Sequence, residues 1–169
     1  NKNDIFFAIK GKKHDGNFFT KESFRKGASF AVVNKIDRTT KIQKQLLVKD
    51  SLKLLTDISK KIRLISFANI IAITGSCGKT SLKELLSNVL AKVSKVSYSP
   101  NSYNNKYGVP LSLFNIKKND DFGIFEVGMD KSGQIDFLSK IIKPDVAVIT
   151  NISYAHAKNF NNLSQIAKA

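Results

Sequence analysis

A short glycine-containing segment carries the clearest chemical signal in the sequence. The apolar run 70–74 suits a buried strand, the residues Gly75-Ser76-Cys77-Gly78-Lys79-Thr80-Ser81 follow it, and a helical pattern begins at Lys79. Glycines let the backbone turn its N–H groups toward an anion, and a helix N-terminus adds partial positive charge. Lys79 would reach the β and γ phosphates of a nucleotide, and the Thr80 hydroxyl would bind Mg²⁺. We therefore predict a phosphate loop, although its two glycines stand closer together than in the standard Walker A motif.

Two other side chains with metal-binding or acid–base chemistry follow predicted strands. Glu126 lies at the end of the apolar run 122–127, and His156 follows the run 146–150. Because the carboxyl ends of parallel strands meet at one edge of a sheet, both residues would lie near the phosphate loop, where Glu126 could hold Mg²⁺. A solvated strand-end glutamate and a structural histidine remain the alternatives. Cys77 could be a nucleophile, but a small residue beside the phosphates is the favoured interpretation.

Two loops could contact a ligand. The first, Lys10 to Phe18, follows a strand and contains Asp15 and Gly16. The second follows another strand, and its amide side chains suit hydrogen bonds to a sugar, a nucleotide or a peptide; they are Asn101, Asn104 and Asn105. Glycine and asparagine also favour ordinary turns, so the residues alone do not decide between a binding loop and a plain one.

These candidate residues need a parallel sheet to bring them together, and the sequence predicts one. Short apolar runs alternate with helical patterns, which is typical of an α/β protein whose second part is doubly wound. The expected strands are 5–9, 29–33, 46–48, 70–74, 93–98, 122–127 and 146–150. The expected helices are 21–26, closed by Gly27, 50–63 with Asp50 as N-cap, 79–91, 110–114 and 134–142. Two small domains would meet near residues 63–68.

Composition excludes several classes of protein. The 169 residues carry a formal net charge of +15, yet 42% of them are hydrophobic, which is enough for packed cores. A single cysteine cannot form an internal disulfide and favours a reducing, cytoplasmic setting. No apolar run approaches the roughly 20 residues that span a bilayer. The basic residues are spread along the chain and are mostly lysine, so we expect lysine-rich surfaces rather than nucleic-acid recognition.

Together these segments resemble the Mur ligases of bacterial cell-wall synthesis. FFAIKGKKHDGNFF and KGASFAVV resemble the family's UDP-binding amino-terminal domain, and ITGSCGKTS resembles its ATP loop. FEVGMDKSGQIDFLSKIIKPDVAVITNISYAHAKNF is similar to the segment that follows. NSYNNKYGVPLSLF is similar to an asparagine-rich segment that marks one branch of the family. Members of that branch join D-alanyl-D-alanine to UDP-N-acetylmuramoyl-tripeptide through an acyl phosphate. The resemblance implies a monomeric, ATP-dependent ligase in the cytoplasm that uses these two substrates and Mg²⁺, with no nucleic-acid partner and no membrane insertion.

The resemblance also implies roles for residues of this chain. Residues 75–81 would bind the ATP phosphates, Thr80 and Glu126 one Mg²⁺, and His156 a second. Lys79, Glu126 and His156 would be the catalytic residues. The loop residues Lys10, Asp15, Gly16, Asn101, Asn104 and Asn105 would bind substrate. Residues 1–67 would form the UDP-binding domain without its start, and residues 68–169 the first part of the ATP-binding domain.

Several alternatives stay open. A sister Mur ligase that adds a single amino acid to a UDP-muramoyl dipeptide shares the first domain and the ATP loop. A basic nucleic-acid-binding module with a phosphate loop, or a domain that only binds nucleotide, would also fit parts of the sequence. The family's carbamylated lysine would align just after Ala169, and its amino-terminal Ser-Arg motif and carboxyl-terminal domain have no counterpart in this chain. We therefore expect this piece alone to be inactive.

Overall fold

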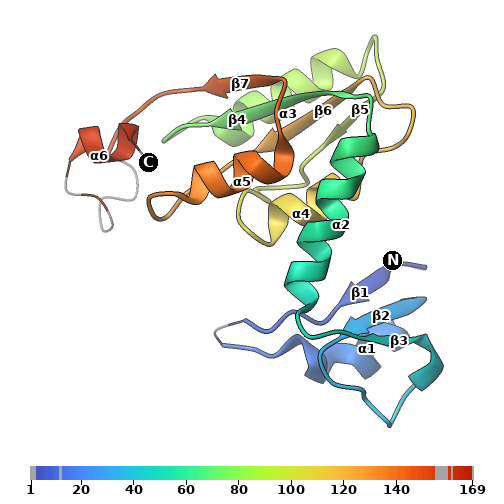
Figure 1. Ribbon diagram of the computed structural model, residues 1–169. Helices are drawn as coiled ribbons and strands as arrows, with labels where there is room; N and C mark the ends of the chain where they lie inside the picture. The colour runs from blue at the N-terminus through green and yellow to red at the C-terminus, as the bar shows by residue number, and fades with distance from the viewer. Residues whose placement is uncertain (1–2, 12, 155–159, 161, 169) are drawn as a thin grey trace. The chain divides into compact units, whose positions relative to one another are not determined.

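The computed structural model describes residues 3–11, 13–154, 160 and 162–168, and it confirms the predicted α/β class with parallel sheets. The chain divides into two compact units, Asn1–Asp57 and Ile58–Ala169, and the division falls inside helix α2 (Figure 1). Within the described part of the chain, no helix combines the length and the apolar character that a membrane span requires. The predicted assignment of residues 1–67 and 68–169 to two ligand-binding domains stays a prediction.

The first unit is built on a small parallel sheet of three strands in the order β1-β2-β3. The strands are β1 (Ile5–Phe7), β2 (Phe30–Val33) and β3 (Gln45–Leu47), so the sequence overestimated the length of the first strand. A 3₁₀ turn, η1 (Gly16–Phe19), leads into helix α1 (Thr20–Arg25), and a second, η2 (Ile42–Lys44), precedes β3. Gly27 follows α1 with φ 101, which confirms the predicted helix end. Ala8, Phe24, Ala31 and Val33 form the buried core.

Helix α2 (Ser51–Ile65) begins as the sequence predicts and runs slightly further. Asp50 Oδ1 accepts a hydrogen bond from the N–H of Lys53 at 2.9 Å, which confirms Asp50 as the N-cap. Near the other end, Arg63 Nε donates to the carbonyl of Ile142 at 2.8 Å, and its Nη2 forms an ion pair with Asp145 at 2.9 Å. These contacts tie the last turns of α2 to the second unit, of which they are part.

The second unit contains a parallel sheet of four strands in the order β5-β6-β4-β7. The strands are β4 (Asn69–Thr74), β5 (Val96–Tyr98), β6 (Phe122–Glu126) and β7 (Val146–Ile149). The helices are α3 (Lys79–Leu90), α4 (Gly108–Leu113), α5 (Gln134–Ile142) and the short α6 (Leu163–Ala167). The strand predicted from Val93 starts only at Val96, because the chain first makes a turn in which the Val93 N–H donates to the carbonyl of Leu90.

Helices cover both faces of this sheet, α3 on one side and α4 and α5 on the other (Figure 1). Side chains alternate across a strand, so Ile70 and Ala72 of β4 join Phe125 and Val127 in the core beneath α4 and α5. By the same alternation, Glu126 points to the α3 side. The sheet thus directs a carboxylate at the end of β6 toward the helix that begins with Lys79.

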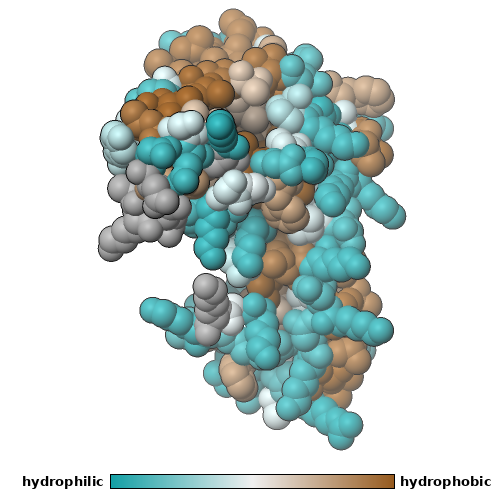
Figure 2. All heavy atoms as spheres, turned by 60° about the vertical axis from the view of Figure 1, so that its left-hand side comes forward, coloured by the Kyte–Doolittle hydropathy of each residue, from teal (hydrophilic) through white to brown (hydrophobic). Residues whose placement is uncertain are grey.

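Strand β7 forms an edge of the sheet and is exposed. Val146 has 52% of its surface exposed and Ile149 has 62%, and Leu85 of α3 is 62% exposed as well. Figure 2 shows hydrophobic side chains at the surface of this unit among mostly hydrophilic ones. In the described structure β7 is therefore an exposed strand, although its sequence is apolar.

Candidate functional site

The predicted phosphate loop connects the carboxyl end of β4 to the start of α3. Gly75 has φ 130 and Gly78 has φ 79, and Gly78 directly precedes the first helical residue, Lys79. The first helical hydrogen bond joins the N–H of Leu82 to the carbonyl of Gly78 at 2.9 Å. The N–H groups of residues 79–81 therefore have no acceptor within the helix and point outward from its positive end. This geometry suits a bound phosphate.

The segment after β7 holds the loop from one side. Asn151 accepts two of the loop's hydrogen bonds, from the N–H of Ser76 to its carbonyl and from the N–H of Cys77 to its Oδ1, both at 3.0 Å. Ser76 Oγ donates to the carbonyl of Ser153, and Thr150 Oγ1 donates to the carbonyl of Cys77. The backbone N–H groups of Ser76 and Cys77 thus already bind Asn151, and binding of the ATP phosphates by residues 75–81 stays a prediction.

Lys79 lies across its own loop. Its Nζ donates to the carbonyl of Gly75 at 2.6 Å and more weakly to that of Ser76 at 3.4 Å. An ammonium group has three donors on a flexible stem, so it can exchange these carbonyls for phosphate oxygens without a change in the backbone. These bonds keep Nζ at the loop, and binding of phosphate by Lys79 stays a prediction.

Glu126 is buried, with only 1% of its surface exposed, so the alternative of a solvated strand-end residue is wrong. Its Oε2 accepts a hydrogen bond from Thr80 Oγ1 at 2.8 Å, and its Oε1 accepts one from Asn104 Nδ2 at 2.7 Å. Its backbone N–H donates to Ser99 Oγ at 2.9 Å. Residues from α3, β6 and the segment after β5 therefore meet at one carboxylate, beside the phosphate loop.

This arrangement fits a magnesium ion. Mg²⁺ in nucleotide sites takes one or two carboxylates, a hydroxyl, waters and phosphate oxygens rather than a cage of protein ligands. Glu126 and Thr80 provide a buried carboxylate and a hydroxyl 2.8 Å apart at the helix end. Within the described ranges no group of three His, Cys, Asp or Glu side chains could hold a metal by itself.

The predicted asparagines behave differently from one another. Asn104 contacts Glu126, as described above. Asn105 Oδ1 accepts hydrogen bonds from the N–H groups of Tyr107 and Gly108, both at 3.0 Å, and so caps the start of α4. Asn101 lies in the turn after β5 with φ 48, and its carbonyl accepts a hydrogen bond from Lys83 Nζ. Binding of substrate by Asn101, Asn104 and Asn105 stays a prediction.

Sequence patterns did not single out two features of this site. One is Lys83, and the other is a group of residues that hydrogen-bond to the phosphate loop, here called the clasp: Thr150, Asn151 and Ser153. Lys83 has no exposed surface, although lysine is rarely buried. A helical spacing of four residues from Lys79 is the one sequence signal that could have pointed to it. The clasp depends on β7 lying next to β4, which the order of strands along the chain does not reveal.

In the first unit, hydrogen bonds hold the described residues of the loop that is predicted to bind substrate. Lys10 and Asp15 face each other in a short antiparallel bridge, and Gly16 N–H donates to the carbonyl of Ile9 at 3.0 Å. Asp15 Oδ1 accepts hydrogen bonds from the backbone N–H and the Nδ2 of Asn17, at 2.9 and 2.6 Å. These bonds, the backbone one first, hold the pKa of the Asp15 carboxyl below its ordinary value of 3.8. The loop therefore keeps a charged carboxylate at neutral pH.

A hollow of 820 Å³ lies beside this loop, at the carboxyl ends of the parallel strands. Nine residues line it: Asp15, Asn17, Phe18, Asn34, Lys35, Ile36, Asp37, Arg38 and Leu47. Asn17 Oδ1 accepts from the N–H of Asn34 at 2.9 Å, so the two loops that form its walls are joined. Ligands of parallel sheets bind at this edge, and the lining carries both signs of charge, with Lys35 and Arg38 beside Asp15 and Asp37.

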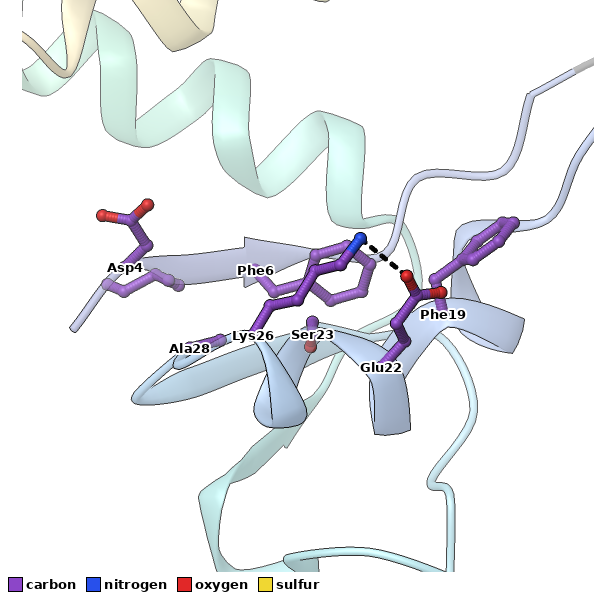
Figure 3. A pocket seen from close by; sticks show the side chains of 8 residues that line it. Asp4, Phe6, Phe19, Glu22, Ser23, Lys26 and Ala28 are labelled. Carbon is purple, nitrogen blue, oxygen red and sulfur yellow. Dashed lines mark ion pairs between the residues drawn. The ribbon is translucent and has the colours of Figure 1, made fainter. Parts of the chain in front are cut away.

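A second hollow in the same unit, of 320 Å³, has a different character. It lies between β1 and α1, where Phe6 and Phe19 line it together with the ion pair of Lys26 and Glu22, whose Nζ and Oε1 are 2.6 Å apart (Figure 3). The ion pair engages the one cation that lines this hollow, and the hollow lies away from the carboxyl edge of the sheet. It is therefore a poorer phosphate site than the hollow beside Asp15.

His156 lies outside the described residues, so its predicted role as a metal ligand stays a prediction. Cys77 carries an exposed free thiol in the phosphate loop. Its backbone N–H and carbonyl both bond to the clasp, and its predicted role as a small residue beside the phosphates stays a prediction.

The sequence resembles known proteins over nearly its whole length. A family model described as the Mur ligase middle domain matches residues 73–169. A protein of Rickettsia prowazekii named UDP-N-acetylmuramoyl-tripeptide--D-alanyl-D-alanine ligase is 38% identical over 168 residues, which are 99% of this chain and 37% of the relative. A protein of the same name from Buchnera aphidicola is 35% identical over 98% of this chain and 36% of the relative. The chain thus spans little more than a third of the length of these curated relatives.

Solved structures agree with these matches. The crystal structure of MurF from Acinetobacter baumannii superposes with a TM-score of 0.87 at 32% identity, over 99% of this chain and 37% of that one. The structure of MurF ligase from Thermotoga maritima in complex with ADP gives a TM-score of 0.81 at 32% identity, over 99% of this chain and 39% of that one. The similarity includes both units of the chain.

Proposed function

Because the chain belongs to the Mur ligase family, we propose that it provides the UDP-binding part and the phosphate loop of an ATP-dependent ligase. This ligase joins D-alanyl-D-alanine to UDP-N-acetylmuramoyl-tripeptide, the reaction that the names of its relatives describe. The relatives carry this activity in their names, and the chain covers little more than a third of their length. The proposal assigns the same activity to the whole protein. The single cysteine, which has no partner for an internal disulfide, agrees with a reducing, cytoplasmic setting.

The meeting of Thr80, Glu126 and Asn104 beside the phosphate loop is the observation that supports this proposal most. Thr80 and Glu126 provide a hydroxyl and a carboxylate for Mg²⁺. Asn104, which contacts Glu126, belongs to the asparagine-rich segment that resembles one branch of the family. A solved relative is in complex with ADP, which supports nucleotide binding by this chain. A domain that merely binds nucleotide would not need the contact from Asn104.

The proposed chemistry has two steps. In the first, a carboxylate oxygen of the tripeptide attacks the γ-phosphorus of ATP, the bond from that phosphorus to the bridging oxygen breaks, and ADP leaves. In the second, the amine of D-alanyl-D-alanine attacks the acyl carbon, phosphate leaves, and the nitrogen loses a proton to solvent or a base. Lys79 would neutralise charge on the transferred phosphoryl group, which is the dominant contribution in such reactions.

The residues around Glu126 would hold the metal. Mg²⁺, when bound, supplies positive charge to the phosphate oxygens and helps align them. Thr80 would offer its hydroxyl oxygen, and Glu126 would offer the carboxylate that Asn104 keeps oriented. His156 is proposed as the ligand of a second ion, as the resemblance implies.

We place the UDP part of the substrate in the first unit, in the hollow beside Asp15. Lys35 and Arg38 line this hollow and could neutralise a diphosphate, while Asn17 and Asn34 could hydrogen-bond to a sugar or a base. Lys10 and Gly16 belong to the loop next to it and stay candidates for contacts with the same ligand.

Lys79→Met tests the proposal on the chain itself. Loss of a charge-assisted hydrogen bond to a phosphate should weaken binding of Mg-ADP, measured by isothermal titration calorimetry, about tenfold to a hundredfold. Lys92→Met is the matched control, because Lys92 is an exposed lysine just beyond α3. In the intact enzyme, Lys79→Ala should nearly abolish ADP release that depends on both the UDP-tripeptide and the dipeptide. Unchanged turnover would refute the proposed function.

A further inference from the structure

Lys83 is a charged side chain buried in the second unit that the proposed reaction does not use. It has no exposed surface, and its Nζ donates to the carbonyl of Ser99 at 2.8 Å and to that of Asn101 at 2.5 Å. The same nitrogen forms an ion pair with Glu84 Oε1 at 2.9 Å. These three contacts use all three donors of the ammonium group, which explains how the charge can be buried.

The two carbonyls belong to the turn that leaves β5. In this turn Asn101 adopts φ 48, a left-handed conformation that asparagine takes more readily than most other residues with a side chain. Lys83 donates hydrogen bonds to the backbone on both sides of residue 100, so a side chain from α3 supports the shape of the turn.

The same turn leads directly to the candidate metal site. Ser99 Oγ accepts from the N–H of Glu126 at 2.9 Å, Ser102 Oγ lies 3.4 Å from Thr80 Oγ1, and Asn104 Nδ2 donates to Glu126 Oε1 at 2.7 Å. Within six residues, the segment 99–104 thus contacts both proposed ligands of the metal. Lys83 itself contacts neither of them in any hydrogen bond that the described structure contains.

We propose that Lys83 is a positioning residue for the Mg²⁺–nucleotide complex, which acts by fixing segment 99–104 against Thr80 and Glu126. The inference rests on the proposed function, because it concerns the same nucleotide site. Lys79 and Lys83 lie one turn apart on α3 and have separate tasks. Lys79 faces the phosphates, and Lys83 holds the backbone that orients the metal ligands. Lys83 touches no reacting atom and is therefore not a catalytic residue.

The experiment measures how much Mg²⁺ improves binding of ADP to this chain. The affinity for ADP is determined with Mg²⁺ and with EDTA, and their ratio is the magnesium gain. Lys83→Met removes the three donors but keeps the length of the side chain. It should reduce the magnesium gain about tenfold, while the affinity in EDTA changes by less than about twofold. Glu84→Gln is the matched control, because it leaves both carbonyl contacts of Lys83 in place, and its magnesium gain should stay unchanged.

A double-mutant cycle tests the route of the effect. If Lys83 acts through the segment that carries Asn104, then Lys83→Met should lower the magnesium gain much less in an Asn104→Ala background than in the parent chain. Equal losses in both backgrounds would overturn the proposal. Lys83→Gln, which keeps a shorter donor, should give an intermediate gain.

The possible failures are distinguishable. If the parent chain binds no Mg-ADP, the proposed function fails first. If the parent binds and Lys79→Met weakens binding, but Lys83→Met keeps the full magnesium gain, then the positioning role alone is overturned. If Lys83→Met and Lys83→Gln both unfold at the assay temperature, the proposal is overturned as well, because Lys83 would then serve the fold rather than the site.

Discussion

Gly75→Ala should damage the phosphate loop far more than the same change at Gly78. A Cβ at Gly75 would overlap Thr150 Oγ1 and come within 3.0 Å of the backbone nitrogen and oxygen of Asn151. A Cβ at Gly78 would meet no heavy atom within 4 Å. Both residues have positive φ, 130 at Gly75 and 79 at Gly78, so backbone strain contributes at both positions and steric overlap only at Gly75.

The expected magnitudes follow from these two contributions. For Gly75→Ala, the φ of 130 should cost about 1–3 kcal/mol of unfolding free energy. The overlap with Thr150 and Asn151 should add about 1–3 kcal/mol, as in other overpacked sites. For Gly78→Ala, the left-handed conformation alone should cost about 1–2 kcal/mol. At roughly 4 °C per kcal/mol, the melting temperature of the second unit should fall by about 8–24 °C for Gly75→Ala and about 4–8 °C for Gly78→Ala.

The assay can follow the second unit by itself. The chain has no tryptophan, and its four tyrosines all lie in that unit: Tyr98, Tyr103, Tyr107 and Tyr154. Tyrosine fluorescence during heating therefore reports the unfolding of the second unit without a contribution from the first unit. Binding of Mg-ADP is measured on the same samples below the transition.

Equal losses of stability for the two variants would refute this reasoning. That result would mean that the segment after β7 moves away from the loop without a loss of folding free energy. Thr150 and Asn151 would then not constrain the phosphate loop. Gly75→Ala should also weaken ADP binding more than Gly78→Ala, since the overlap pushes the loop from its acceptors on Asn151.

Two further predictions concern carboxylates. Glu126→Gln keeps a group that can hydrogen-bond to both Thr80 and Asn104, so thermal stability should change little. The magnesium gain in ADP affinity should nevertheless fall about tenfold, because the charge is lost; a retained gain would exclude Glu126 as a metal ligand. The pKa of Asp15 is lowered in the folded chain, so its charged form stabilises the first unit. This stabilisation is present above the ordinary pKa of 3.8 and is lost as the pH falls through the lower pKa of the folded chain. NMR amide resonances of the first unit should therefore show acid unfolding, and Asp15→Asn should make that unfolding less dependent on pH; an unchanged dependence would argue against the bonds from Asn17 as its cause.

The α/β class, most elements and the loop chemistry could be predicted because they depend on local patterns. Residues 70–81 combine an apolar run, two glycines and a helical pattern, and the structure confirms a strand, a turn with positive φ at both glycines, and a helix from Lys79. Asp50 and Gly27 mark helix ends through short-range hydrogen bonds. The resemblance to the Mur ligases, which rested on such segments, is confirmed by the family match.

The partners of these residues could not be predicted in the same way. The sequence left open whether Glu126 is a solvated residue, because a strand-end glutamate looks the same in either setting. Burial and the contacts from Thr80 and Asn104 follow from the strand order β5-β6-β4-β7, which places β6 between the asparagine segment and the phosphate loop. The clasp from Asn151 depends in the same way on β7 pairing with β4.

The sequence by itself thus determined which local structures form and which of them could bind a nucleotide, since glycine turns, helix caps and alternating side chains act over a few residues. The tertiary structure alone decided which side chains meet, because contacts such as that of Lys83 with the turn at Asn101 require segments from different strands and helices to pack together. Burial, which no local sequence pattern indicates, is what separates Lys83 from the exposed lysines of this chain.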